Sequence, residues 1–159
     1  MTADDFLRSV HDAKIEARRC ETRLAELRAQ CERLTAAYGD GTPGGGGGDK
    51  HRDAVLAAAA DQAGELVRAV GLYHRYVDLA EKFIMTLPDV RHRMVLRIRY
   101  IDGARWGDVQ TALRVYGMSY ELRQIFRLHG AALSEARRRF DAWAEKHPEI
   151  QANEEDGRA

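Results

Sequence analysis

Two long runs of apolar residues, spaced alternately by three and four, constrain this chain more than any other feature. The first run occupies Phe6, Val10, Ala13, Ala17, Cys20, Leu24, Leu27, Cys31, Leu34 and Tyr38. The second occupies Leu56, Ala59, Ala63, Leu66, Val70, Tyr73, Val77, Ala80, Ile84 and Leu87. This heptad spacing is typical of helices that pack along their length. The simplest way to bury both seams is an antiparallel helical hairpin over residues 1–87, or a pair of such hairpins in a dimer.

A glycine-rich stretch separates the two predicted helices. Residues 41–50 read GTPGGGGGDK, a composition that neither buries apolar surface nor holds a helix cheaply, so we expect a loop there. Several seam positions are alanine, and Gly64 and Gly71 each weaken the second helix by roughly 1 kcal/mol relative to alanine. Because the hairpin alone is therefore weak, the sequence favours a homodimer.

Shorter helices follow Pro88. Asp89 can cap a helix that runs to about Tyr100, with Met94, Val95, Ile98 and Ile101 on its inner face. A second helix runs from about Trp106 to Leu113, and Ser119 can cap a third that reaches Phe140. No segment has the period of a strand. The prediction is an all-α chain: the hairpin, a small helical unit at 88–143, and an acidic, disordered tail at 144–159.

Positive charge is concentrated in one part of the chain. The whole sequence has 25 basic and 25 acidic residues, yet residues 83–140 contain 11 Lys and Arg against 5 Asp and Glu. The tail from residue 141 has 2 against 6. An arginine-rich segment between neutral and acidic ones is typical of nucleic-acid binding, although a solvated charged face has the same composition.

The arginine-rich segment also has the layout of a helix-turn-helix, in which the second helix enters the DNA major groove. It contains LPDVRHRMVLRIRY at Leu87–Tyr100, then IDG, Trp106, and RLHGAAL at Arg127–Leu133. Together these residues resemble the fourth conserved region of primary bacterial sigma factors. They are still more similar to the small sigma-factor-like regulators of phages and prophages. The resemblance covers roughly residues 86–139.

The resemblance implies a recognition helix that begins near Glu121, with Arg123, Gln124 and Arg127 facing the bases. Arginine pairs with guanine through two hydrogen bonds and glutamine pairs with adenine in the same way. At helical spacing, the buried side of this helix would comprise Ile125, Leu128, Ala132 and Leu133. The chain departs from the family by extra residues within 113–120, which either lengthen the turn or add part of a helical turn and so alter the base-reading register.

Other residues of this segment have more general interpretations. Four arginines flank the proposed reading surface and are candidates for phosphate contacts, each with an ordinary surface role as the alternative: Arg97, Arg99, Arg105 and Arg114. His92 and His129 have no second ligand at metal-binding spacing, so packing or capping is the expected role. Trp106 is expected to anchor the core.

Nothing in the sequence indicates catalysis. There is no phosphate-binding loop, nucleophile elbow or Cys/His cluster with metal spacing, so we expect no enzyme and no cofactor. Cys20 and Cys31 lie more than about 12 Å apart on one straight helix, so we expect two reduced thiols. Without a signal-like or membrane-spanning segment, we expect the cytoplasm, and the resemblance makes that of a bacterial host.

These observations predict a phage-type transcription regulator that binds double-stranded DNA, with host RNA polymerase as a partner implied by the resemblance. Two alternatives remain. A small genome-packaging subunit, similar to the small subunit of phage terminases, also joins a helix-turn-helix to helical oligomerisation segments. A helical module that binds only protein would share the same pattern.

Overall fold

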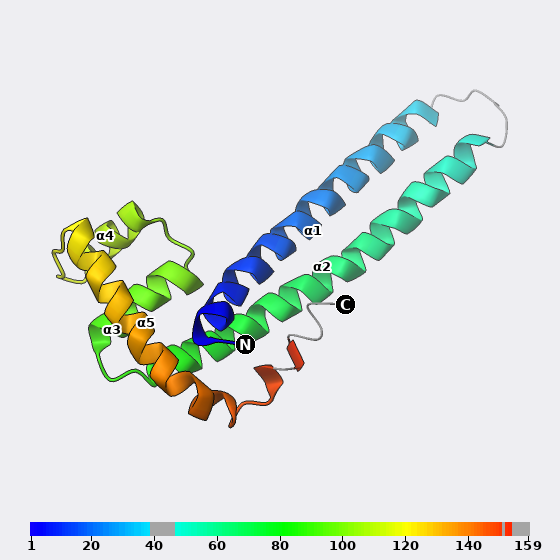
Figure 1. The fold of residues 1–159 in the computed structure, drawn as a ribbon. Helices are drawn as coiled ribbons and strands as arrows, with labels where there is room; N and C mark the ends of the chain where they lie inside the picture. The colour runs from blue at the N-terminus through cyan, green and yellow to red at the C-terminus, as the bar shows by residue number, and fades with distance from the viewer. Residues whose placement is uncertain (39–46, 151, 154–159) are drawn as a thin grey trace. The chain divides into compact units, whose positions relative to one another are not determined.

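The computed structural model describes residues 1–38, 47–150 and 152–153, and among them it contains helices and turns but no strand (Figure 1). A long helix pair comes first, α1 (Ala3–Tyr38) and α2 (Gly47–Met85). Shorter helices follow: α3 (Val90–Leu96), the π-helix η1 (Arg97–Ile101), α4 (Trp106–Val115) and α5 (Leu122–Ala144). The predicted all-α class, a long hairpin followed by short helices, is confirmed.

The chain forms two compact units whose boundaries fall inside the long helices. Unit 1 comprises residues 1–13 and 72–159, and unit 2 comprises residues 14–71. The boundary expected at residue 87 therefore lies within unit 1. The first turns of α1 and the last turns of α2 belong to the same compact unit as α3, α4 and α5 (Figure 1).

Unit 2 is a helix pair built on the predicted seams. On α1 the seam residues Ala17, Cys20, Leu24 and Leu27 are buried, and the Cys20 carbonyl accepts a hydrogen bond from Gln62 Nε2 of α2 at 3.4 Å. Both cysteines are free thiols. Burial raises the pKa of the Cys20 thiol.

Two expectations for the start of α2 are wrong. Residues 47–50 are helical, so the predicted loop does not extend to residue 50, while residues 39–46 lie outside the described residues. The seam also starts at Val55, which is 6% exposed, whereas Leu56 is 50% exposed. Neighbouring residues of a helix point about 100° apart, so the packing against α1 decides which of the two faces inward.

Unit 1 has an aromatic core to which distant segments contribute. Phe6 of α1 packs against Phe83 of α2, with ring centroids 6.0 Å apart, and against Phe140 and Trp143 of α5 at 5.4 and 5.6 Å. Tyr76, Leu79 and Phe83 are buried in addition to the predicted seam positions of α2. This part of α2 is thus packed on more than one side, because α1 and the C-terminal helices both contact it.

The tail that was expected to be disordered begins at residue 144, and its described residues, 144–150 and 152–153, are part of unit 1. Ile150 and Asn153 are each 3% exposed, and Arg75 Nε donates a hydrogen bond to Asn153 Oδ1 at 2.9 Å. Residue 151 and residues 154–159 lie outside the described residues. An apolar residue and an amide in an otherwise acidic segment are enough to attach it to α2.

The helix after Pro88 begins as predicted. Asp89 is its N-cap and accepts a hydrogen bond from the Arg91 N–H at 2.8 Å. Hydrogen bonds from Arg91 lower the pKa of the Asp89 carboxyl to about 2. Val95, Ile98 and Ile101 are buried as expected and Met94 is half-buried, while Leu96 is also fully buried at the junction between α3 and the wider turns of η1.

Candidate nucleic-acid interface

Helices α4 and α5 and the connection between them have the helix-turn-helix layout. The C-terminus of α4 is closed by two hydrogen bonds, from Gly117 N to Arg114 O at 3.0 Å and from Met118 N to Leu113 O at 3.0 Å. This is the Schellman arrangement, which needs a residue with positive φ after the helix cap. Gly117 supplies it with a φ of 79°. Residues 116–121 then lead to α5, and Gln110 Nε2 of α4 holds them by donating to the Tyr120 carbonyl at 2.9 Å.

The start of α5 corrects the predicted cap. The helix begins at Leu122 with Glu121 as its N-cap, and Ser119 precedes it in the connection. The Gln124 carbonyl oxygen accepts a hydrogen bond from the Glu121 N–H at 2.8 Å, as in a capping box. Residues 116–121 therefore belong to the connection rather than to α5.

Of the three candidate base-reading residues, two are free to contact a ligand. Arg123 and Arg127 are exposed, lie one turn apart on the same side of α5, and form no ion pair with any described residue. Gln124 is exposed as well, but its carbonyl oxygen is committed to the helix cap. This bond uses one of the two acceptor sites of the oxygen and ties the side chain to the helix cap, which disfavours a two-bond contact to adenine.

The opposite side of α5 packs against the rest of unit 1. Ile125 and Ala132 are fully buried, and Leu128 and Leu133 are half-buried against the same core, as predicted. A charged outer side and an apolar inner side make α5 an amphipathic helix whose first turns are accessible. Gly130 lies on the outer side, where a Cβ atom would meet no other group.

A cluster of rings fixes the orientation of α5 relative to η1 and α4. The Tyr100 hydroxyl and His129 Nε2 are 3.2 Å apart, and their rings stack with centroids at 5.8 Å. Trp106 contacts His129 edge-on at 4.9 Å and Phe126 edge-on at 5.0 Å. Burial, assisted by the charge of Arg99, lowers the pKa of His129, so the imidazole at the centre of the cluster is kept neutral.

Two of the four candidate phosphate-binding arginines have side-chain contacts within the fold, and the other two have no ion pair among the described residues. Arg99 donates to the Ala104 carbonyl at 2.7 Å and its guanidinium lies 4.7 Å from the Trp106 ring centre, and Arg97 pairs with Glu81 at 3.1 Å. These contacts give Arg97 and Arg99 structural roles. Arg105 and Arg114 are exposed near the two ends of α4 and have no ion pair among the described residues. They are the better candidates for phosphate contacts.

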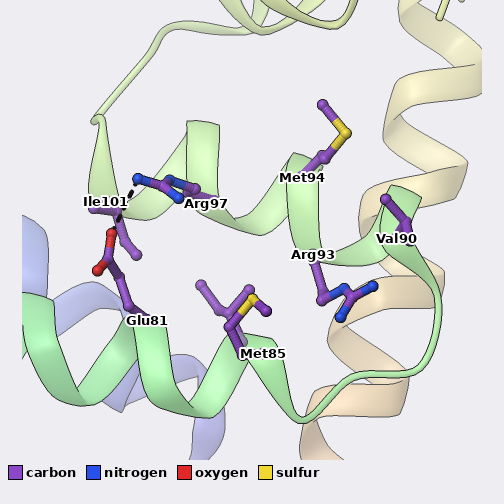
Figure 2. A pocket seen from close by; sticks show the side chains of 8 residues that line it. Glu81, Met85, Val90, Arg93, Met94, Arg97 and Ile101 are labelled. Atoms are coloured by element: carbon purple, nitrogen blue, oxygen red, sulfur yellow. Dashed lines mark ion pairs between the residues drawn. The ribbon is translucent and has the colours of Figure 1, made fainter. Parts of the chain in front are cut away.

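A groove lies in unit 1 between the end of α2 and the α3–η1 segment. It has a volume of about 320 Å³ and an apolar lining from Ile84, Met85, Val90, Met94 and Ile101, with Glu81, Arg93 and Arg97 at its edge (Figure 2). Met85 and Val90 are 64% and 53% exposed. Sequence patterns missed this groove because it is formed by segments on both sides of Pro88, and only Ile84 of its apolar residues belongs to a seam.

His92 occupies a polar position between two helices. Its Nε2 lies 3.9 Å from Asp89, and its Nδ1 lies 3.7 Å from Glu135 of α5. The described residues hold no group of three or more His, Cys, Asp or Glu that could bind a metal ion. Here His92 links α3 and α5 by packing, the role expected from the sequence.

Two features of α5 were not predicted from the sequence. Phe126 is 49% exposed one turn from Arg123, and no sequence pattern assigned this aromatic residue a role. The capping role of Gln124, in contrast, has a recognisable signal in the Glu121-x-x-Gln124 spacing.

Comparisons with protein-family models, with curated proteins and with solved structures found no match for this chain. Among the described residues, no helix combines the length and the apolar character needed to cross a membrane.

Proposed function

We propose that this protein is a sequence-specific DNA-binding regulator of transcription, of the phage or prophage sigma-factor-like kind. The observation that carries the proposal is the pair Arg123 and Arg127, exposed on the first two turns of α5 in a helix-turn-helix arrangement. Residues that enter the major groove lie on these turns in helix-turn-helix proteins, and arginine is the residue that most often reads guanine there. The role is one of binding rather than catalysis.

Electrostatics support the same proposal. Arg105 and Arg114 provide unpaired positive charge near the two ends of α4, and residues 83–140 have an excess of basic over acidic residues. In a helix-turn-helix the first helix crosses the DNA backbone, where such arginines contact phosphates. Binding of this kind weakens steeply as salt rises, because phosphate contacts release counterions.

Selection of bound duplexes from a random pool at moderate salt tests the proposal. We expect an enriched motif for the unmodified protein and its loss after Arg123→Ala with Arg127→Ala, since each two-bond contact to a base discriminates by about 1 to 3 kcal/mol. The matched control is Arg18→Ala with Arg28→Ala, which removes two exposed arginines from unit 2. Equal affinity for all duplexes, or an enriched motif unaffected by the first pair of substitutions, contradicts the proposal.

The groove favours a second candidate function, binding of a protein partner. Exposed methionine adapts to varied apolar surfaces, and two exposed apolar side chains lie at this groove. The sigma-factor resemblance makes host RNA polymerase the partner to test. Capture of purified RNA polymerase that is abolished by Met85→Asp but not by Val115→Asp, another exposed position, would support it. Absence of duplex binding at low salt would make protein binding the primary role.

A further inference from the structure

Phe126 is an exposed aromatic residue whose ring is already held in place. It is 49% exposed, yet its ring packs edge-on against Trp106 with centroids 5.0 Å apart and planes at 81°. Trp106 is itself fixed by His129 at 4.9 Å and by the Arg99 guanidinium at 4.7 Å. An aromatic side chain fixed in this way loses little conformational entropy when its exposed part contacts a partner.

The position of Phe126 on α5 indicates what kind of partner that is. It follows Arg123 by three residues, so these two side chains are neighbours on the surface of α5, and Arg127 lies one turn beyond Arg123. The next residue on its side of the helix is Gly130, where a Cβ would meet nothing, so bulk does not hinder close approach. A partner that suits this surface combines hydrogen-bond acceptors or negative charge with an apolar group.

Thymine in the DNA major groove has this combination of groups. The C5-methyl group of thymine is the one apolar group that a base pair presents in the major groove, and Phe is among the side chains that contact it. Guanine offers acceptors to arginine on neighbouring base pairs. We propose that Phe126 reads the C5-methyl group of a thymine next to the bases contacted by Arg123 and Arg127. This inference rests on the proposed function.

Substitution of deoxyuridine for thymine, one position at a time, tests it in the duplex enriched by selection. This change removes the methyl group and leaves every hydrogen-bonding group of the base pair in place. Loss of one buried methyl contact weakens association by about fourfold. We expect that loss at one or two thymines with the unmodified protein, and no loss at those positions with Phe126→Ala.

The matched control is Val115→Ala, which shortens another highly exposed apolar side chain near the connection before α5 and should keep the methyl effect. If Phe126→Ala does not fold, the scan with the unmodified protein still decides, because a duplex without any methyl-sensitive thymine overturns the inference. A methyl effect that persists in Phe126→Ala overturns it too. In both cases the proposed function stands as long as selection enriches a motif. Failure to enrich any duplex contradicts both the proposed function and the inference about Phe126.

Discussion

At the scale of single residues, the ring cluster around His129 shows how one protonation state supports the proposed interface. The imidazole lies against Tyr100 and Trp106, and Trp106 in turn contacts Phe126 on the outer side of α5. A protonated His129 would place a positive charge in a partly buried site close to Arg99, which is why its pKa is lowered from 6.5. The folded state therefore favours the neutral form of His129.

A pH dependence of stability follows from this residue. Between its lowered pKa and 6.5 the unfolded chain binds more protons than the folded chain, so the free energy of unfolding falls as the pH decreases through that range. We expect the thermal midpoint to drop as the pH is lowered below 6.5, and His129→Gln to reduce this dependence. Thermal unfolding followed by circular dichroism at several pH values measures it. The exposed His11→Gln is the control, and an unchanged pH profile in His129→Gln would refute the assignment.

At the scale of helices, α2 contains two residues, Gly64 and Val67, whose identity no contact among the described residues explains. Gly64 lies inside this helix, and a Cβ placed there would meet no atom within 4 Å. A glycine inside a helix destabilises it relative to alanine because the unfolded chain has more backbone freedom. Val67, 73% exposed, lies one turn further along on the same side.

We expect Gly64→Ala to raise the free energy of unfolding by about 0.5 to 1 kcal/mol. Denaturant unfolding at two protein concentrations measures this change. A stabilisation that does not depend on concentration means that this side of α2 is free in solution. A destabilisation that grows with protein concentration would contradict the prediction and would indicate that a second chain covers Gly64, as the homodimer expected from the weak hairpin requires.

At the scale of the whole molecule, the first turns of α1 are part of the unit that contains α5. Phe6 is fully buried among Phe83, Phe140 and Trp143, and Asp4 pairs with Arg137 of α5 at 2.8 Å. The helix-turn-helix is consequently not an independent module that begins at residue 88. Its stability depends on the N-terminus of the chain.

Phe6→Ala should therefore destabilise the C-terminal helices. Removal of a buried phenylalanine costs about 3 to 5 kcal/mol, through lost burial and a residual cavity. Tryptophan fluorescence during denaturant unfolding reports on the C-terminal helices, since Trp143 lies 5.6 Å from Phe6 and Trp106 contacts α5. The control Ile15→Ala, at a position 52% exposed on the same helix, should change stability by no more than about 0.5 kcal/mol. An unchanged fluorescence transition in Phe6→Ala would contradict the dependence of the C-terminal helices on α1.

The sequence by itself determined the features that depend on near neighbours along the chain. Heptad spacing predicted the long helix pair, and Asp89 predicted the start of α3. Helical period, side-chain capping and backbone preference are local properties, so a single sequence reveals them. The outward-facing positions of Arg123 and Arg127 were implied by the sigma-factor resemblance, and both side chains are exposed.

Only the tertiary structure decided which residues share a core and which side chains remain exposed and free to contact a ligand. The unit boundaries at residues 13/14 and 71/72, the burial of Tyr76 and Phe83, and the pairing of Arg97 with Glu81 all depend on contacts between distant segments. A seam shows that a face is apolar, but it does not show how many neighbours pack around it. Phe126 likewise has a side chain typical of a core. It is half-exposed in the structure, where its ring contacts Trp106 edge-on.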